Sequence, residues 1–190
     1  DWEDLTYGWD DTLATQVLYV GDVGDNSGSR DELTIQIVPE PEVPTDGEPV
    51  EALLDGGDYA TMQLTYPDGV SHNCETLMWD PVTGDLYLVT KKTNDLSHVF
   101  RKPAPHVGGT TTELEPVTSL PFGQAPLSGS SSTTGGDISP SGDRVLIRTY
   151  SRAWMWHREP GQSIAEALEG EACDLDAPDE QQAEAVCFTP

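Results

Sequence analysis

Cys74-Glu75-Thr76-Leu77-Met78-Trp79-Asp80-Pro81 is the stretch that decides the fold, because variants of it recur along the chain. The segments 2–7 and 183–190 follow the same order, with Glu3 and Glu184 at the position of Glu75. A fourth copy at 135–140 keeps the end of the phrase but has Thr134 where the others carry glutamate. Repetition of a short β unit is typical of a β-propeller, so the sequence predicts one.

Two of the copies continue in parallel through 80–89 and 139–147, and each reads as a strand, a Pro/Gly turn and a second strand. We therefore expect an all-β protein, a β-propeller of four-stranded blades. The expected strands are 5–7, 16–20, 33–38 and 60–66, then 76–79, 85–90, 98–102 and 114–120, then 137–139, 144–150 and 153–157. A short helix with Ser163 as cap and Gly170 as stop should follow.

These units predict one domain with approximate blades at 1–68, 69–123 and 130–176 and the start of another at 177–190. The chain begins inside a repeat, without an initiator Met, so we expect a propeller fragment that is incomplete at both ends. A β-sandwich also uses many short strands, but its strands need not resemble one another. The loop at 39–49 is rich in proline and acids and should be solvated, and 123–136 should be a flexible connection.

The charge of the chain limits its partners. It has 34 acidic against nine basic residues and a formal net charge of -25. Such a surface repels nucleic acid and anionic bilayers and attracts cations. The same acidity is typical of salt-tolerant or very soluble secreted proteins. No apolar run is long enough to cross a membrane, and the partner class left open is a small molecule or a protein.

The cysteines leave two interpretations open. Cys173 and Cys187 are spaced so that they could close a disulfide in an oxidising compartment, with Cys74 left over. Alternatively, all three are small buried apolar residues. The sequence contains no CxxC motif or paired histidines near them, so a zinc site is not expected.

The repeated glutamates are the first candidate site. If the units are blades, Glu3, Glu75 and Glu184 start the innermost strands and converge on the central channel. Converging carboxylates repel one another unless a cation or basic side chains lie between them, and Ca²⁺ is the simplest such cation. The alternative is that each glutamate caps its own blade by accepting backbone N–H groups.

The loop at 21–28 is the second candidate site. Asp22, Asp25 and Asn26 follow a predicted strand in a glycine-bent loop whose oxygens could surround Ca²⁺. The spacing is not that of an EF-hand, and the same composition is also that of an ordinary turn.

Basic residues at the ends of the second strands form the third candidate site. Aligning the units places Asp22, Thr90 and Arg148 at one point, the exit of the second strand. Together with Lys91 and Lys92 they could hold an anionic group such as phosphate beside a metal. The alternative is a set of salt-bridged loop ends.

Other chemistry has little support in the sequence. No Gly-x-Ser-x-Gly motif occurs, and the four histidines show no metal-ligand pairing. Trp154 and Trp156 alternate with Met155, so both indoles lie on one strand face, where core packing is favoured over a sugar platform.

The chain resembles bacterial secreted or lipid-anchored β-propellers of a broad phytase-like and esterase-like group. Three features carry the resemblance: glutamate-x-leucine at a strand start, the segment 80–89, and Gly-Asp-x-Gly-Asp-Asn at 21–26. The resemblance implies an extracellular, periplasmic or cell-surface location. In the phytases, calcium ions held by channel acids activate water and bind substrate phosphates. Carried over, that makes Glu3, Asp22, Asp25, Glu75 and Glu184 metal candidates and Lys91, Lys92 and Arg148 anion contacts.

We therefore expect a calcium-stabilised extracellular propeller that acts as a binding or scaffolding module. The alternatives are a calcium-dependent phosphoesterase that uses metal-activated water, and a purely structural module of a surface protein.

Overall fold

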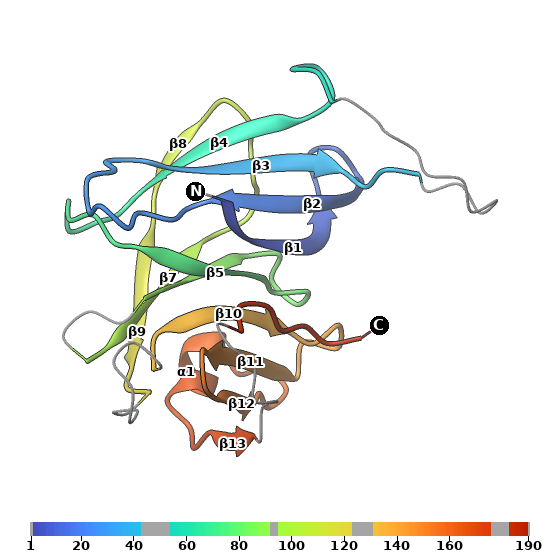
Figure 1. Ribbon diagram of the computed structural model, residues 1–190. Helices are drawn as coiled ribbons and strands as arrows, with labels where there is room; N and C mark the ends of the chain where they lie inside the picture. Colours follow the sequence, from blue (N-terminus) through green and yellow to red (C-terminus); the bar gives the residue numbers. More distant parts are fainter. Residues whose placement is uncertain (1, 43–53, 92–94, 123–130, 176–182, 190) are drawn as a thin grey trace.

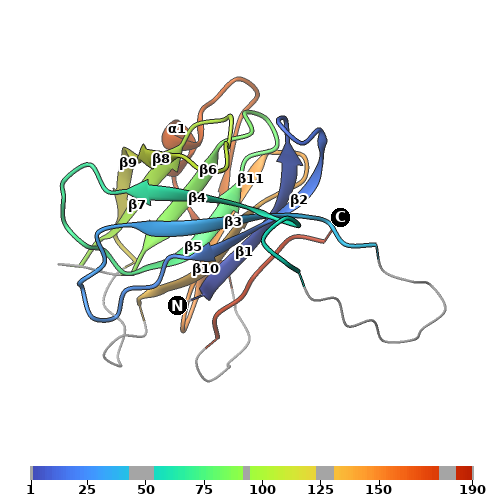
Figure 2. The same cartoon turned by 90° about the horizontal axis from the view of Figure 1, so that it is seen from above.

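The computed structural model describes residues 2–42, 54–91, 95–122, 131–175 and 183–189. The described chain is all-β, with thirteen strands in three sheets and one short helix. Apart from one parallel pair, the strands pair antiparallel, and none of the sheets closes into a barrel. Figure 1 shows the sheets following one another in chain order, and Figure 2 shows the first strands of the sheets side by side.

The first sheet has the strand order β1-β2-β3-β4-β8. Its strands are β1 (Trp2–Asp10), β2 (Thr15–Asp22), β3 (Leu33–Pro39), β4 (Ala60–Thr65) and β8 (Thr111–Glu113). The first four were predicted, although β1 is longer than expected. Strand β3 alternates as its sequence requires, with Leu33, Ile35 and Ile37 buried. Strand β8 was not predicted; it comes from the loop after β7 and pairs parallel with β4.

The second sheet has the order β5-β6-β7-β9. Its strands are β5 (Cys74–Trp79), β6 (Leu86–Thr90), β7 (Ser97–Lys102) and β9 (Glu115–Leu120). Strand β6 is buried along its whole length because the second sheet lies between the other two. Strand β9 lies at the sheet edge, where its Pro116 is tolerated, and the ladder to β7 shifts at Phe100, opposite this proline.

The third sheet has the order β10-β11-β12-β13. Its elements are β10 (Thr133–Ile138), β11 (Arg144–Thr149), β12 (Ala153–His157), the helix α1 (Ile164–Leu168) and β13 (Cys173–Leu175). The predicted helix is confirmed, and Ser163 caps it in a reciprocal capping box with Glu166. The prediction of a flexible connection over 123–136 is wrong for its last residues, because β10 begins at Thr133. Of that segment, 123–130 lies outside the described residues.

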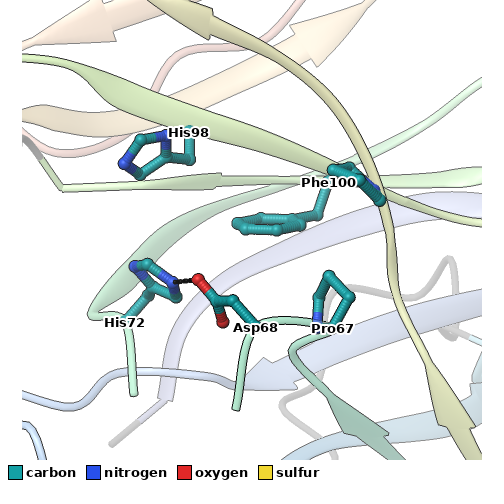
Figure 3. Close-up of a pocket in the computed structure, with 6 residues that line it drawn as sticks. Pro67, Asp68, His72, His98 and Phe100 are labelled. Atoms are coloured by element: carbon teal, nitrogen blue, oxygen red, sulfur yellow. Dashed lines mark hydrogen bonds and ion pairs between the residues drawn. The ribbon is translucent and has the colours of Figure 1, made fainter. Parts of the chain in front are cut away.

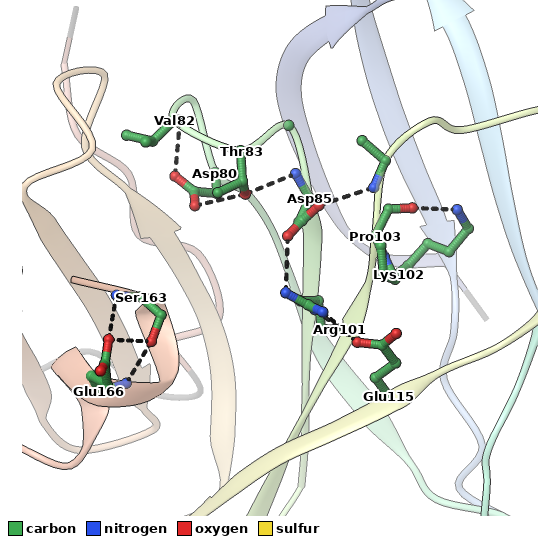
Figure 4. Close-up of polar contacts among 12 residues, drawn as sticks. Asp80, Val82, Thr83, Asp85, Arg101, Lys102, Pro103, Glu115, Ser163 and Glu166 are labelled. Carbon is green, nitrogen blue, oxygen red and sulfur yellow. Dashed lines mark hydrogen bonds and ion pairs between the residues drawn. The ribbon is translucent and has the colours of Figure 1, made fainter. Parts of the chain in front are cut away.

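The repeated turns have the geometry that the sequence predicts. Asp80 accepts hydrogen bonds from the Val82 backbone N–H at 3.0 Å and the Thr83 hydroxyl at 2.9 Å (Figure 4). Gly84 and Gly142 lie in the turns that follow the first strands of their sheets, with Gly142 one residue nearer to its strand, and have positive φ angles of 76° and 72°. Only glycine adopts this conformation without strain, so both copies of the turn require it.

Two apolar clusters fill the spaces between the sheets. One contains Tyr19, Ile35 and Leu64 of the first sheet together with Leu77 and Leu88 of the second. The other joins the second and third sheets, and Trp156 is buried in it, with Trp154 packed against it. The prediction that the two indoles belong to core packing is therefore confirmed.

The first strands of the first and third sheets accept backbone N–H groups from the segment packed against them. In β1, Asp4 and Thr6 accept the backbone N–H groups of Leu77 and Trp79 of β5, at 2.9 and 3.2 Å. On β10, Asp137 accepts the N–H of Phe188 at 2.8 Å. Residues 183–189 therefore lie against the third sheet at the place that β5 takes against the first sheet.

Candidate functional site

The sequence position of the repeated glutamate lies at a bulge at the start of each first strand. The register shifts between Trp2 and Asp4 in β1, between Cys74 and Thr76 in β5, and between Thr133 and Gly135 in β10. The residues skipped by these shifts are Glu3, Glu75 and Thr134, the positions that the sequence repeat aligns. A bulge redirects a side chain away from the regular alternation of the strand.

Glu75 is buried and has two strong partners. Its Oε1 forms an ion pair with Lys91 Nζ at 2.7 Å and accepts a hydrogen bond from Asn73 Nδ2 at 2.9 Å. The Lys91 ammonium also lies 5.7 Å from the centroid of the Tyr150 ring. Burial alone would lower the pKa of Lys91, but the carboxylate of Glu75 and the contact with Tyr150 raise it above its usual value. Lys91 is therefore a permanent cation among these acids.

Glu3 and Glu184 lie in the same electrostatic neighbourhood. Burial raises the pKa of Glu3, the carboxylate of Glu75 raises it further, and Glu184 adds to the effect, while Lys91 opposes it. The side chain of Glu3 lies against Gly24 so closely that a β-carbon there would overlap it. Glu3 therefore lies close enough to Glu75, Glu184 and Lys91 to respond to their charges. We call Glu3, Glu75, Glu184 and Lys91 the glutamate cluster.

The loop at 21–28 uses its carboxylates internally. Asp22 forms an ion pair with Arg30 Nη1 at 2.6 Å, and this hydrogen bond lowers the pKa of Asp22 to about 2. Asp25 is buried and accepts hydrogen bonds from the backbone N–H groups of Ser29 and Arg30, at 3.0 and 2.8 Å, and from the Ser27 hydroxyl at 3.1 Å. Burial opposes its ionisation, yet these bonds hold its pKa below the usual value.

Asn73 links the two predicted sites. Its Oδ1 accepts the backbone N–H of Asp25 at 2.5 Å, and its Nδ2 donates to Asn26 Oδ1 at 3.2 Å as well as to Glu75. The glutamate cluster and the Asp22 loop are therefore adjacent. Sequence reasoning missed Asn73, Arg30 and Tyr150, because none of them belongs to the repeated phrase.

The strand registers do not place Asp22, Thr90 and Arg148 at one equivalent point. The strand registers align Asp22 with Thr90 and with Thr149, whereas Arg148 aligns with Gly21 and Val89. The sequence alignment was wrong by one residue here, because Gly142 lies one residue earlier in its turn than Gly84 does, so that aligning the two glycines shifts the following strands by one residue. Arg148 is buried and donates to the carbonyl oxygen of Ala185 at 3.0 Å. Lys92 lies outside the described residues.

The cysteines are free thiols, with Cys74 buried and Cys173 and Cys187 exposed. Among the described residues, no three acidic, histidine or cysteine side chains are placed to hold one metal ion together. The described part of the chain also contains no helix long and apolar enough to cross a membrane.

Comparison with known proteins assigns no family: no family model matches this chain, and no curated protein is significantly similar to it.

Proposed function

We propose that the chain is a binding or scaffolding module built as part of a β-propeller, in which sheets of one kind follow each other around a common axis. The support is a contact pattern that repeats from sheet to sheet. Leu77 and Trp79 of β5 face the first sheet, where a side chain at Gly8 would collide with the Trp79 indole. Thr76 and Met78 of the same strand face Gly136 of the third sheet. Each first strand thus presents alternate residues to the preceding and the following sheet.

The observation that carries the proposal is the outer face of β1. Leu5 and Tyr7 stand at the strand positions of Leu77 and Trp79, yet their side chains are 57% and 48% exposed, whereas Leu77 is fully buried. Trp9 continues this row and is 42% exposed. The half-buried Leu18 and Val20 of β2 lie directly opposite Tyr7 and Leu5 and extend the same apolar face. We call these five residues the outer β1 face.

A contiguous exposed apolar face of this kind marks an interaction surface. Because the equivalent positions of β5 pack against a sheet, the outer β1 face is suited to another four-stranded sheet of the same repeat. A ring closed in this way is a rigid scaffold, and its strand ends and loops remain available for a ligand.

Sedimentation of the 190-residue chain at increasing concentration tests the proposal. Without a partner sheet, the outer β1 face should cause reversible self-association. The double variant Leu5→Lys/Tyr7→Lys should be monomeric under the same conditions, because two ammonium groups on the face prevent its burial. Val70→Lys, which changes another exposed apolar residue, should associate like the wild type. A wild-type chain that stays monomeric at millimolar concentration would contradict the proposal.

Calcium is the second part of this proposal. The Asp22 loop does not fit a calcium ion in the geometry described, since Asp22 and Asp25 already have internal partners. The glutamate cluster contains three carboxylates and one ammonium, which is paired with Glu75, so Ca²⁺ would act as a counter-ion held by Glu3 and Glu184. A cation bound only by the native state raises stability by mass action.

Thermal unfolding should therefore be compared in CaCl₂, in EDTA and in NaCl of matched ionic strength. We expect a higher Tm in CaCl₂ than in NaCl, and we expect this difference to disappear in Glu3→Gln. Asp31→Asn, which removes an exposed charge, should keep the calcium effect. Equal Tm values in CaCl₂ and NaCl would show that calcium only screens the charge of the chain.

The phosphoesterase alternative gains no support from the contacts. Lys91 is paired with Glu75, and Arg148 is held under residues 183–189. The resemblance to secreted bacterial propellers and an extracellular location remain predictions, which fractionation of the producing cell would check.

A further inference from the structure

A separate cavity of about 320 Å³ lies between the connection from β4 to β5 and the strands β7 and β9. Its lining consists of Pro67, Asp68 and His72 of the connection, His98 and Phe100 of β7, and Pro116 of β9. Figure 3 shows the two imidazoles and the Phe100 ring around this space, with the Asp68 carboxylate between His72 and Pro67. Neither the glutamate cluster nor the outer β1 face contributes to it.

The local sequence explains why the cavity exists. Pro116 has no N–H to donate to the ladder, and opposite it the pairing of β7 with β9 shifts between Val99 and Phe100. Prolines at 67 and 116 supply rigid apolar walls that cannot collapse by rotating about φ. The cavity is therefore built into the backbone.

Three rings form the aromatic part of the wall. The ring centroids of His72 and His98 are 5.5 Å apart, those of His72 and Phe100 are 5.6 Å apart, and those of His98 and Phe100 are 6.5 Å apart. All three pairs are inclined, with interplanar angles between 48° and 69°. Tilted rings at this spacing present both faces and edges to one small space.

One carboxylate gives the cavity its charge. Asp68 Oδ2 is 2.9 Å from His72 Nε2, and Oδ1 accepts the Val70 backbone N–H at 3.0 Å. Burial opposes ionisation of Asp68, but the His72 contact and the Val70 hydrogen bond keep its pKa below the usual value. Its side chain is still 47% exposed, and the lining includes no lysine or arginine. At neutral pH the wall therefore combines ring surfaces with an accessible negative charge.

We propose that this cavity binds a small organic ammonium group, of which trimethylammonium is the type. A methylated ammonium ion is attracted by the negative face of Phe100 and by the Asp68 carboxylate, and its methyl groups contact the two prolines and the imidazoles. Its positive charge also agrees with the net charge of -25, which raises the local concentration of cations. A neutral ligand of the same shape gains only the apolar contacts.

The test is titration of the whole chain with choline and with its neutral isostere 3,3-dimethylbutan-1-ol. The ring signals of His72, His98 and Phe100 are followed by NMR at a fixed pH of 8. Choline should shift these signals saturably, and the isostere should bind at least about fivefold more weakly. Equal affinities, or no shift with choline, would overturn the proposal.

Two charge-matched variants separate the cavity from the general acidity of the chain. Asp68→Asn keeps an oxygen for the Val70 N–H and should weaken choline binding about threefold or more while leaving the isostere unaffected. Asp58→Asn removes the same charge from an exposed turn and should bind choline like the wild type. Equal losses in both variants would mean that choline responds only to net charge, and the proposal would be wrong.

Discussion

Asp4 and Asp137 connect neighbouring units with the same pair of hydrogen bonds. Asp4 accepts the N–H of Leu5 beside it and that of Leu77 in the next sheet, both at 2.9 Å. Asp137 accepts the N–H of Ile138 beside it at 2.9 Å and that of Phe188 at 2.8 Å. Burial raises the pKa of Asp4 to about 7, although the two N–H groups that it accepts lower it. Burial also raises the pKa of Asp137.

The raised pKa of Asp4 predicts a pH dependence. Between the unfolded value of 3.8 and about 7, the folded state binds more protons than the unfolded state, so stability falls as pH rises through this window. One such group contributes a slope of up to about 1.4 kcal/mol per pH unit. Asp4→Asn has no proton to lose, so its free energy of unfolding in urea should vary less with pH between 4 and 7.

The exposed Asp31→Asn serves as the control for this experiment and should retain the wild-type slope. Identical slopes for Asp4→Asn and the wild type would show that Asp4 is not the group responsible. The raised pKa values of Asp137 and Glu3 contribute in the same direction, so the slope should be reduced in Asp4→Asn without being abolished.

At the residue scale, the sequence aligned Glu3, Glu75 and Thr134, which the strand registers place at equivalent bulges, but it did not reveal the partners of the glutamates. Glu3, Glu75 and Glu184 were predicted to approach one another because equivalent positions of repeated units meet. Asn73 and Arg30 were not found, because a hydrogen-bond partner outside the repeat is set by tertiary packing. The position of Arg148 was missed by one residue, since Gly84 and Gly142 occupy different positions within turns of equal length.

At the scale of elements, the close packing of residues 183–189 against β10 requires that residue 135 has no side chain. A β-carbon there would overlap the backbone oxygen of Glu184. Gly135→Ala should therefore displace the segment and weaken its hydrogen bonds to Thr134, Asp137 and Arg148. We expect the Phe188 amide to exchange with solvent roughly tenfold faster or more, measured by hydrogen exchange.

Gly56→Ala is the matched control, because a β-carbon at that exposed turn meets nothing within 4 Å. The amides of β11 should exchange at wild-type rates in both variants. Unchanged protection of Phe188 in Gly135→Ala would mean that the segment is held by other contacts.

The predicted strands were confirmed where the sequence contains a sufficiently long apolar pattern. Strands β3, β6 and β11 follow dense runs of valine, leucine and isoleucine. The three-residue strands β8 and β13 are mostly exposed, and they form only because a neighbouring strand offers an unpaired edge. Their sequences contain no periodic signal, so only the tertiary structure specifies them.

At the scale of the whole molecule, a buried ion pair joins the second and third sheets. Arg158, which follows β12, donates through Nη1 to Asp80 Oδ1 at 2.8 Å and through Nε to the Gln162 carbonyl oxygen at 2.6 Å. The side chains of Arg158 and Asp80 are 6% and 0% exposed. Asp80 was recognised as a turn residue of the repeat, but its pairing across 78 residues could not be read from the sequence.

Removing one partner of this pair should loosen the contact between the two sheets. Arg158→Ala leaves Asp80 buried without its cation, and such changes cost about 3–5 kcal/mol, measured here by urea unfolding. Arg152→Ala, which breaks the exposed pair with Asp174, should cost less than about 1 kcal/mol.

The double variant Asp80→Asn/Arg158→Met separates charge from packing. It keeps the amide oxygen for the Val82 N–H and leaves no unpaired charge, so it should be more stable than Arg158→Ala. If it is no more stable than that single variant, then an unpaired charge on Asp80 is not what destabilises Arg158→Ala, and the sheets are held together by the apolar cluster around Trp156 rather than by the ion pair.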